Sequence, residues 1–383
     1  MTTTSDRTDD PQTTTGRPTA GTWRPRTRAL GSVALVAVLA VLPLLPVEIP
    51  YVFGGPFDSP GVLNLLALML VFGAVALTYD LLFGFTGLLS FGHSLYFALG
   101  TYGTAVAINH LDLGLGAAVA VVAGLGIVVP LVLGAICLRV SGIALAMVTL
   151  AFAQAGAIFV ARDPLEITGG ELGLALEFER LPPAFVGVVD TANLYWLALG
   201  LAVAVYLVAR VAVRSRPGRV WLAIRENERR VEVLGLRPYG YKLGVFVLAS
   251  FLASLCGVVY VLLVRGAHPD TIEATFTLTL LVMVVLGGTG TLWGAVLGGM
   301  LYTYLDHRLV ELSSSDVVAQ LPGVLAAPLS EPQFILGALF VVLVLFFPGG
   351  IAALASGRNG GPARDLLRRM LRGKRAVDGR GGR

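Results

Sequence analysis

A few polar side chains lie inside or beside long apolar segments, and they are the residues with which this chain could do chemistry. His93 lies in an apolar segment next to a glycine-rich stretch, and a histidine in that setting can relay protons across a membrane. No carboxylate partner is evident for it, so a hydrogen-bonded structural role is the favoured alternative. The side chains that could line a passage, or could instead satisfy helix backbone, are Ser90, His93, Thr149, Gln154 and Thr289.

The familiar catalytic patterns are missing from the sequence. The nearest match to the phosphate-binding loop GxxxxGK[ST], at residues 235–242, fails at Tyr241. There is no HExxH, and residues 87–92 do not form the GxSxG nucleophile turn. Cys137 and Cys256 lie in apolar runs without nearby ligands, which favours small buried side chains over a disulfide or a metal site. We therefore expect no catalytic residue, no metal and no cofactor in this chain.

The amino-acid composition indicates that these side chains are carried by membrane-spanning helices. Of the 383 residues 56% are hydrophobic and only 14% are charged, and the mean hydropathy is +0.80. A soluble domain cannot bury that much apolar surface, so the chain belongs in a bilayer. At about 20 residues per span, the composition allows about ten transmembrane helices. Ten apolar runs match that number: 29–47, 62–82, 91–109, 114–138, 140–161, 191–213, 243–264, 274–287, 292–309 and 332–349.

The run 274–287 is the exception in length. At about 1.5 Å per residue it is too short for a hydrocarbon core of about 30 Å. We expect either a short or re-entrant half-helix, or a span that is completed through the glycine-rich turn after it.

The distribution of Lys and Arg predicts the orientation. If all ten runs cross the membrane, the loops on the outer side hold only Arg162, Arg180, Arg265 and Arg308. The positive-inside rule then places both termini in the cytoplasm. Residues 1–28 read as a disordered cytoplasmic tail, 29–349 as the transmembrane domain, and 350–383 as a basic cytoplasmic tail.

Two loops are longer than tight turns. Loop 162–190 is acidic and would lie outside, whereas loop 214–242 is strongly basic and would lie inside. Within the inner loop, apolar positions spaced by helical turns predict a helix over 220–234, with Gly235 as its stop. Acidic residues interrupt the basic run, which favours a docking element over a mere anchor to lipid headgroups. The residues assigned to docking are Arg219, Arg225, Glu226, Asn227, Glu228 and Gly235.

Glycines gather in two clusters. The first, in 84–103, favours broken or re-entrant backbone beside a pathway, with close helix packing as an equal alternative. The second, in 286–299, repeats glycine every fourth residue. That spacing predicts a packing stripe on one helix face, made of Gly290, Gly294 and Gly298.

Five ordered blocks resemble the permease subunits of branched-chain amino-acid ABC importers, in particular the LivM type. The first block is Gly84, Gly87, Ser90, Gly92, His93, Phe97, Gly100 and Tyr102. The second is Arg139, Gly142, Ala146, Thr149, Leu150 and Phe152, and the third is Thr168, Gly169, Gly170, Gly173 and Leu174. The fourth is Gly218, Arg219, Ala223, Ile224, Arg225, Glu226, Asn227 and Glu228, followed by Gly235, Lys242 and Phe246. The fifth is Leu286, Gly287, Gly288, Gly290 and Gly294.

The resemblance implies an all-α, multi-pass plasma-membrane permease with a fold like that of type II importers. It implies a complex with a second, LivH-type permease, two ATP-binding subunits that use the ATP, and an extracytoplasmic solute-binding protein. Membrane lipid is a further expected partner, and nucleic acid is not. ATP would drive the inner helix and switch the accessible side, while loop 162–190 would help to receive the binding protein.

Alternatives remain open at this stage. Within the same family the substrate could be urea, a short amide or an aromatic acid instead of a branched-chain or other amino acid. From other classes, the rivals are an ion-coupled secondary transporter or channel and an intramembrane enzyme. Spans almost free of carboxylates argue against ion coupling, and the missing catalytic pairs argue against an enzyme.

Overall fold

The computed structural model describes residues 37–44, 55–177, 179, 181–182, 191–313, 332–346 and 349–355. The predicted tail 1–28 and nearly all of the basic tail 350–383 lie outside these residues, as does most of the first apolar run. Residues 37–41 are helical and belong to a first unit, Met1–Val41. Everything below concerns the second unit, Leu42–Arg383.

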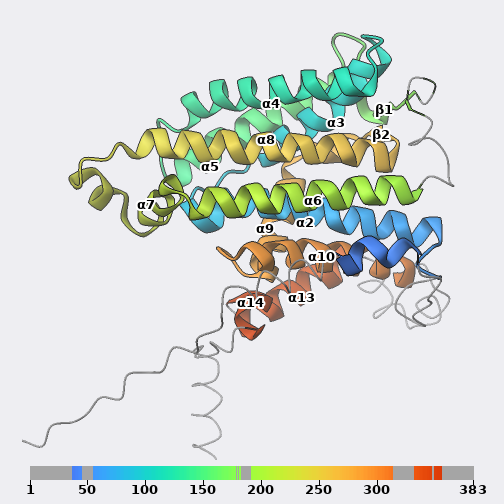
Figure 1. The fold of residues 1–383 in the computed structure, drawn as a ribbon. Helices are drawn as coiled ribbons and strands as arrows, with labels where there is room; N and C mark the ends of the chain where they lie inside the picture. The colour runs from blue at the N-terminus through green and yellow to red at the C-terminus, as the bar shows by residue number, and fades with distance from the viewer. Residues whose placement is uncertain are drawn as a thin grey trace, which may run out of the picture. The chain divides into compact units, whose positions relative to one another are not determined.

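The second unit is built almost wholly of helices (Figure 1). Its elements in chain order are η1 (Leu42–Leu44), α2 (Pro60–Thr86), α3 (His93–Asn109), α4 (Leu115–Cys137), α5 (Ile143–Arg162), η2 (Gly170–Leu172), β1 (Leu174–Ala175), α6 (Thr191–Arg214), α7 (Arg216–Val233), α8 (Pro238–Val264), β2 (Gly266–Ala267), η5 (Pro269–Thr271), α9 (Ala274–Gly287), α10 (Leu292–Ser313), α13 (Pro332–Phe346) and α14 (Gly350–Ala355). From residue 60 onward, each predicted apolar run therefore corresponds to one helix.

Fewer helices than predicted meet the requirements of a span. Among the described residues, α2, α4, α5, α6 and α8 are long and apolar enough to cross a membrane. A sixth is reached if α9 and α10 count as one broken span, because they meet at a bend of 120° across a short break. The described residues thus form a mostly helical fold with five or six apolar spans, and they do not confirm the count of ten. The short run 274–287 is the first arm of that bent pair.

Burial separates central from peripheral helices. The apolar windows of α2 and α8 are 78% and 67% buried, whereas those of α4, α5 and α6 are 22% to 28% buried. α2 packs against α6, α8 and α10, and α8 also packs against α3 and α4 (Figure 1). A helix that is apolar all round, as α2 and α8 are, can be stable only where other helices surround it. The peripheral helices keep apolar surface for lipid or for a partner.

The helix connections gather at two opposite ends. At one end lie the α2–α3, α4–α5 and α9–α10 connections together with α7, and we refer to this as the α7 end. At the other end β1 pairs antiparallel with β2, and the Asn109 side chain donates to the Ala175 carbonyl over 2.7 Å and accepts from the Glu177 amide over 3.1 Å. The connections predicted to share the inner side thus share the α7 end.

Candidate functional site

Helix α7 forms because its ends are capped and one face is apolar. The Ser215 hydroxyl accepts from the Gly218 amide over 3.3 Å at the start, where Pro217 fits the first turn. Trp221 is buried, and its indole Nε1 donates to the Tyr241 carbonyl over 3.0 Å. Gly235 follows the helix with φ +82°, a conformation that suits glycine. The helix predicted over 220–234 therefore exists, but it begins four residues earlier and ends at Val233.

The apolar positions that predicted this helix are Val220, Ile224, Val231 and Leu234. Ile224 and Val231 are buried and Val220 is half-buried, but Leu234 is the residue after the helix and is 74% exposed. The helix is also not continuous, because Asn227 has φ −163° and ψ 104°. The Asn227 Oδ1 accepts from the Arg230 amide over 3.0 Å, which caps the start of a second helical piece. Asparagine is a preferred N-cap, so the break had a signal in the sequence.

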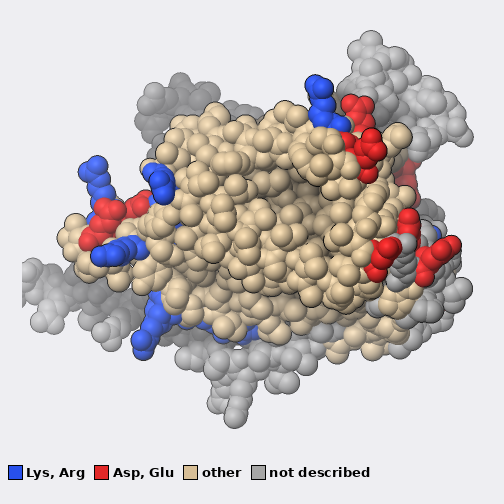
Figure 2. All heavy atoms as spheres, turned by 90° about the horizontal axis from the view of Figure 1, so that it is seen from above, with Lys and Arg blue, Asp and Glu red and all other residues tan. Residues whose placement is uncertain are grey.

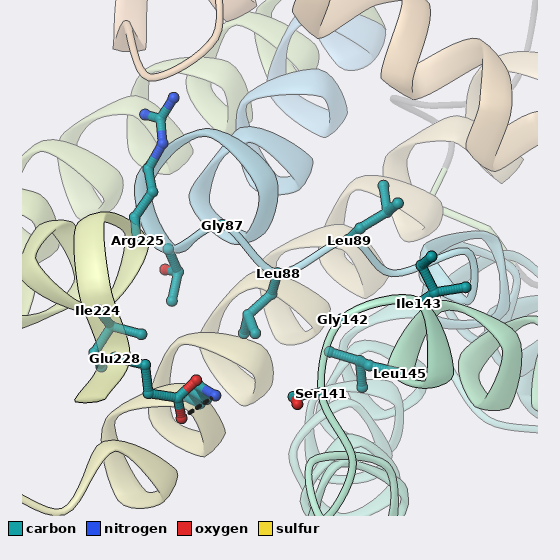
Figure 3. A pocket seen from close by; sticks show the side chains of 12 residues that line it. Gly87, Leu88, Leu89, Ser141, Gly142, Ile143, Leu145, Ile224, Arg225 and Glu228 are labelled. Carbon is teal, nitrogen blue, oxygen red and sulfur yellow. Dashed lines mark hydrogen bonds and ion pairs between the residues drawn. The ribbon is translucent and has the colours of Figure 1, made fainter. Parts of the chain in front are cut away.

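Arg225 is exposed, but its guanidinium reaches the end of α2. Its Nη1 donates to the carbonyl of Gly84, in the last turn of α2. Its side chain also covers the α2–α3 connection, where a Cβ on Gly87 would lie 3.2 Å from the Arg225 Cγ (Figure 3). Carbonyls in the last helical turn lack partners within the helix, and a cation there is favoured. Arg225 thus fastens α7 to the end of α2.

A second attachment lies beyond the break in α7. The Lys242 Nζ in α8 donates to the Glu228 Oε1, and the Lys242 side chain is only 8% exposed. A buried ammonium is tolerated when it is paired in this way. This pair lies on the wall of a pocket of about 300 Å³ at the α7 end (Figure 3). The pocket is lined by Thr86, Gly87, Leu88, Leu89, Ser141, Gly142, Ile143, Leu145, Ile224, Arg225, Glu228 and Lys242.

The remaining surface of α7 is available to a partner. Arg219 and Glu226 are exposed, and so are the apolar side chains of Val233 (86%) and Leu234 (74%). Neighbouring apolar side chains that are exposed at the surface are typical of an interaction surface. Of the six residues assigned to docking, Arg225, Asn227 and Glu228 make contacts within the chain, and Arg219 and Glu226 are exposed. The sixth, Gly235, lies just after the helix.

Three of the five passage candidates lie together where the chain passes from α2 to α3. The Thr149 Oγ1 accepts from the Phe91 amide over 3.0 Å, and the Ser90 Oγ accepts from the Gly92 amide over 3.3 Å. Ser90, Thr149 and His93 are all buried. Their contacts support the broken backbone, which matches the alternative that they satisfy backbone groups.

His93 has a defined hydrogen-bonding role. Its Nε2 lies 2.9 Å from the Thr78 Oγ1, whose own hydrogen is donated to the Val75 carbonyl over 2.7 Å. The Nε2 must therefore carry the proton and donate to Thr78. The ring also packs edge-on against Tyr79, with 5.4 Å between the ring centroids. Its Nδ1 is buried and has no hydrogen-bond partner among the described residues, so the choice between a structural role and a proton relay stays a prediction.

The other two passage candidates lie elsewhere. Gln154 is exposed on α5, and Thr289 is half-buried in the α9–α10 turn. The structure therefore does not bring the five candidates into one site.

The glycine stripe is partly a packing surface. A Cβ on Gly294 would lie 2.6 Å from the Gly287 carbonyl oxygen, and a Cβ on Gly298 would lie 2.1 Å from the Met283 carbonyl oxygen, so α9 and α10 touch through backbone. Gly290 is the exception to the predicted helix face. It lies in the turn before α10 with φ +74°, beside Gly84 and Arg225. A glycine at every fourth residue does not indicate the residue at which α10 begins, and α10 begins only at Leu292.

Asp80 is a residue that the sequence reasoning left out of the site. It lies in α2 with no exposed surface, and its Oδ1 accepts from the Gly290 amide over 2.9 Å. A carboxylate inside an apolar span is rare and usually functional, and that was the available signal. Asp80 joins α2 to the turn between α9 and α10, next to the place where Arg225 joins α2 to α7.

Comparison with known proteins gives a family match over most of the chain. The family model described as the branched-chain amino acid transport system permease component matches residues 61–347. The high-affinity branched-chain amino acid transport system permease protein LivM of Escherichia coli K12 is 26% identical over 317 residues, which cover 76% of this chain and 70% of that protein.

More distant relatives match shorter stretches. The autoinducer 2 import system permease protein LsrC of Klebsiella pneumoniae is 33% identical over 134 residues, covering 33% of this chain and 37% of that protein. The ribose import permease protein RbsC of Escherichia coli K12 is 26% identical over 162 residues, covering 38% and 50%. No solved structure matches this chain.

Proposed function

This chain belongs to the family of branched-chain amino acid transport system permease components, and on that premise we propose that it is the membrane subunit of an ATP-driven importer of branched-chain amino acids. Its several apolar spans and its relatives make it a multi-pass protein of the plasma membrane. Members of the family are transport subunits rather than enzymes. In the proposed complex the ATP is used by two separate ATP-binding subunits.

We place the α7 end in the cytoplasm, with ten spans in the full chain and both termini inside. Charge supports this orientation. Figure 2 shows most of the visible Lys and Arg side chains at the α7 end and most of the visible Asp and Glu side chains at the opposite end. Helix α7 and its flanks carry a run of arginines from Arg214 to Arg237. A basic end is retained on the cytoplasmic side of a membrane.

One observation carries the coupling proposal: α7 is fastened to the span ends on one side and presents apolar side chains to water on the other. Arg225 and Trp221 make the inward attachments, and Val233 and Leu234 make the outward surface. An ATP-binding subunit that docks on this surface can move the ends of the spans through α7. The proposed coupling residues remain Arg219, Arg225, Glu226, Asn227, Glu228 and Gly235, and we add Val233 and Leu234.

The substrate proposal rests on the relatives. The LivM match covers about twice as much of this chain as the matches to the ribose and autoinducer 2 permeases. We propose that a binding protein delivers the amino acid at the end that carries β1 and β2. A LivH-type second permease would complete the passage, with lipid around the peripheral helices.

The first experiment is co-purification of the tagged chain from its native membrane. We expect to recover a second permease and ATP-binding subunits. The variant Leu234→Asp should lose the ATP-binding subunits, because it places a charge in the proposed contact, whereas Leu172→Asp should keep them. Leu172 is the matched control, since it is 92% exposed near the opposite end. Equal recovery from both variants would refute the docking surface.

Uptake into proteoliposomes then tests the substrate. We expect ATP-dependent uptake of leucine, isoleucine or valine by the complex with its binding protein. If the complex takes up ribose but none of these three amino acids, ribose would replace the branched-chain amino acids as the proposed substrate. Uptake by the purified chain without ATP, driven by an ion gradient, would favour the secondary-transporter alternative.

A further inference from the structure

Asp80 is a buried carboxylate that uses only one of its two oxygens. The residue has no exposed surface, and its Oδ1 accepts from the Gly290 amide. Its Oδ2 is enclosed and has no hydrogen-bond partner among the residues that the structure describes. Burying a carboxylate is costly, and an unused oxygen adds to that cost. The contact with Gly290 explains the position of Oδ1, but it does not explain why Oδ2 is buried without a partner.

The surroundings of the Asp80 carboxyl group are crowded on the side of Oδ1. A Cβ on Gly84 would lie 1.8 Å from the Asp80 Oδ1 and 2.4 Å from the Gly290 amide nitrogen, so the carboxylate and the turn meet over Gly84. The Arg225 guanidinium donates to the Gly84 carbonyl, and its Nη1 would lie 2.8 Å from a Cβ on Gly290. Three separate parts of the chain thus converge on one glycine.

Asp80 and Arg225 contact helix ends that carry opposite partial charges. Asp80 faces the turn from which α10 starts, where amides point outward and an anion is favoured. Arg225 faces the last turn of α2, where carbonyls point outward and a cation is favoured. Each charge already has a backbone partner, and each can also attract the other. A guanidinium has five N–H donors, so Arg225 can exchange acceptors without losing its charge-assisted bonds.

We propose that Asp80 and Arg225 are positioning residues that form a charge joint, through which movement of α7 reaches the α9–α10 turn and the α2–α3 connection. This inference rests on the proposed function of α7 as the coupling helix. In the arrangement seen here the guanidinium engages the Gly84 carbonyl. When α7 moves with the ATP-binding subunits, the guanidinium engages the free Asp80 Oδ2, and α10 is pulled through Gly290.

The test compares coupling with assembly in the complete complex in proteoliposomes with its binding protein. The measured quantities are substrate taken up per ATP hydrolysed, recovery of ATP-binding subunits, and melting temperature. Asp80→Asn keeps the Oδ1 acceptor for Gly290, removes the charge and replaces the Oδ2 acceptor with an amide group that only donates. We expect uptake per ATP to fall about fivefold or more, the lower range of ordinary coupling between sites, while assembly is retained. Asp58→Asn, an exposed change of the same kind before α2, should behave as wild type.

Changes at Arg225 keep the inference testable even if Asp80→Asn fails to assemble, because α7 lies on the surface. Arg225→Gln should lower uptake per ATP as Asp80→Asn does, and Arg225→Lys should restore most of it by keeping the charge. The double variant Asp80→Asn/Arg225→Gln should be no worse than the more affected single variant.

Three results would overturn the joint and leave the proposed function standing. Normal uptake per ATP in Asp80→Asn would do so, as would equal effects of Gln and Lys at Arg225. A loss of uptake that is fully explained by lost assembly would show a purely structural contact. A wild-type complex without ATP-dependent uptake would overturn the proposed function itself, and the joint with it.

Discussion

The packing of α9 against α10 leaves no room for a side chain at Gly298, and this gives a quantitative prediction. In Gly298→Ala the new Cβ would lie 2.1 Å from the Met283 carbonyl oxygen and 2.6 Å from the Gly287 amide nitrogen. Ordinary contacts begin near 3.4 Å, so the shortfall is 1.3 Å. Because both atoms are backbone, no rotamer change can relieve the clash and the helices must separate.

The expected cost follows from that separation. A radial gap of about 0.5–1 Å forfeits roughly a quarter to a half of a van der Waals contact, and overpacking of a core costs about 1–3 kcal/mol. With backbone on both sides of the clash, we expect Gly298→Ala to lower the free energy of unfolding by about 3 kcal/mol, the upper part of that range.

Gly200→Ala supplies the matched control. Gly200 lies in α6 and has nothing within 4 Å of its Cβ position, so alanine should be neutral or should stabilise α6 by up to about 1 kcal/mol through helix propensity. The assay is unfolding of the purified protein in mixed micelles with increasing SDS, followed by circular dichroism. Equal unfolding midpoints for Gly298→Ala and Gly200→Ala would refute the close packing of α9 on α10.

Two further predictions concern single hydrogen-bonding groups. Thr78→Val leaves the His93 Nε2 proton buried without an acceptor and should cost about 1–3 kcal/mol in the same unfolding assay, whereas Thr78→Ser should cost clearly less; equal losses would contradict the assigned bond. Asp163 accepts from the Thr168, Ile167 and Gly169 amides over 2.8–2.9 Å, and these bonds hold the pKa of Asp163 below its usual value. Because the pKa is lowered in the folded loop, the stabilisation is present above the ordinary carboxyl pKa of about 3.9 and is lost as the pH falls through the lowered one. Hydrogen exchange of the three amides should therefore be slow at neutral pH and fast in Asp163→Ala, and unchanged exchange in that variant would show that the carboxylate does not order the loop.

Local sequence patterns predicted the helices well. The apolar runs from residue 60 onward each became a helix, because a long apolar stretch in lipid must satisfy its backbone within itself. Helix α7 was also predictable, since Ser215, Pro217 and Gly235 are ordinary end signals. The number of spans was less predictable, because a run such as 274–287 does not show whether the chain continues through the turn or bends away. The 120° bend after α9 is decided by packing against α2 and α14.

At the candidate site, local sequence patterns did not predict which residues contact one another. Arg225 was identified as a functional residue from its place in the loop, but its expected partner was another subunit. Its observed partner is Gly84, 141 residues earlier in the chain. Asp80 was not among the predicted site residues, because its partner Gly290 lies 210 residues later.

The sequence by itself determined the class of protein, the positions of the helices, the basic loop 214–242 and the resemblance to amino-acid permeases. These properties depend on composition and on spacings of a few residues, which a single chain displays directly. Only the tertiary structure decided that Asn227 divides α7, that Gly290 belongs to a turn, and that Asp80 and Arg225 converge on Gly84. These features depend on which helix ends meet, and the physical reason is that packing between distant segments chooses the partner of each buried charge.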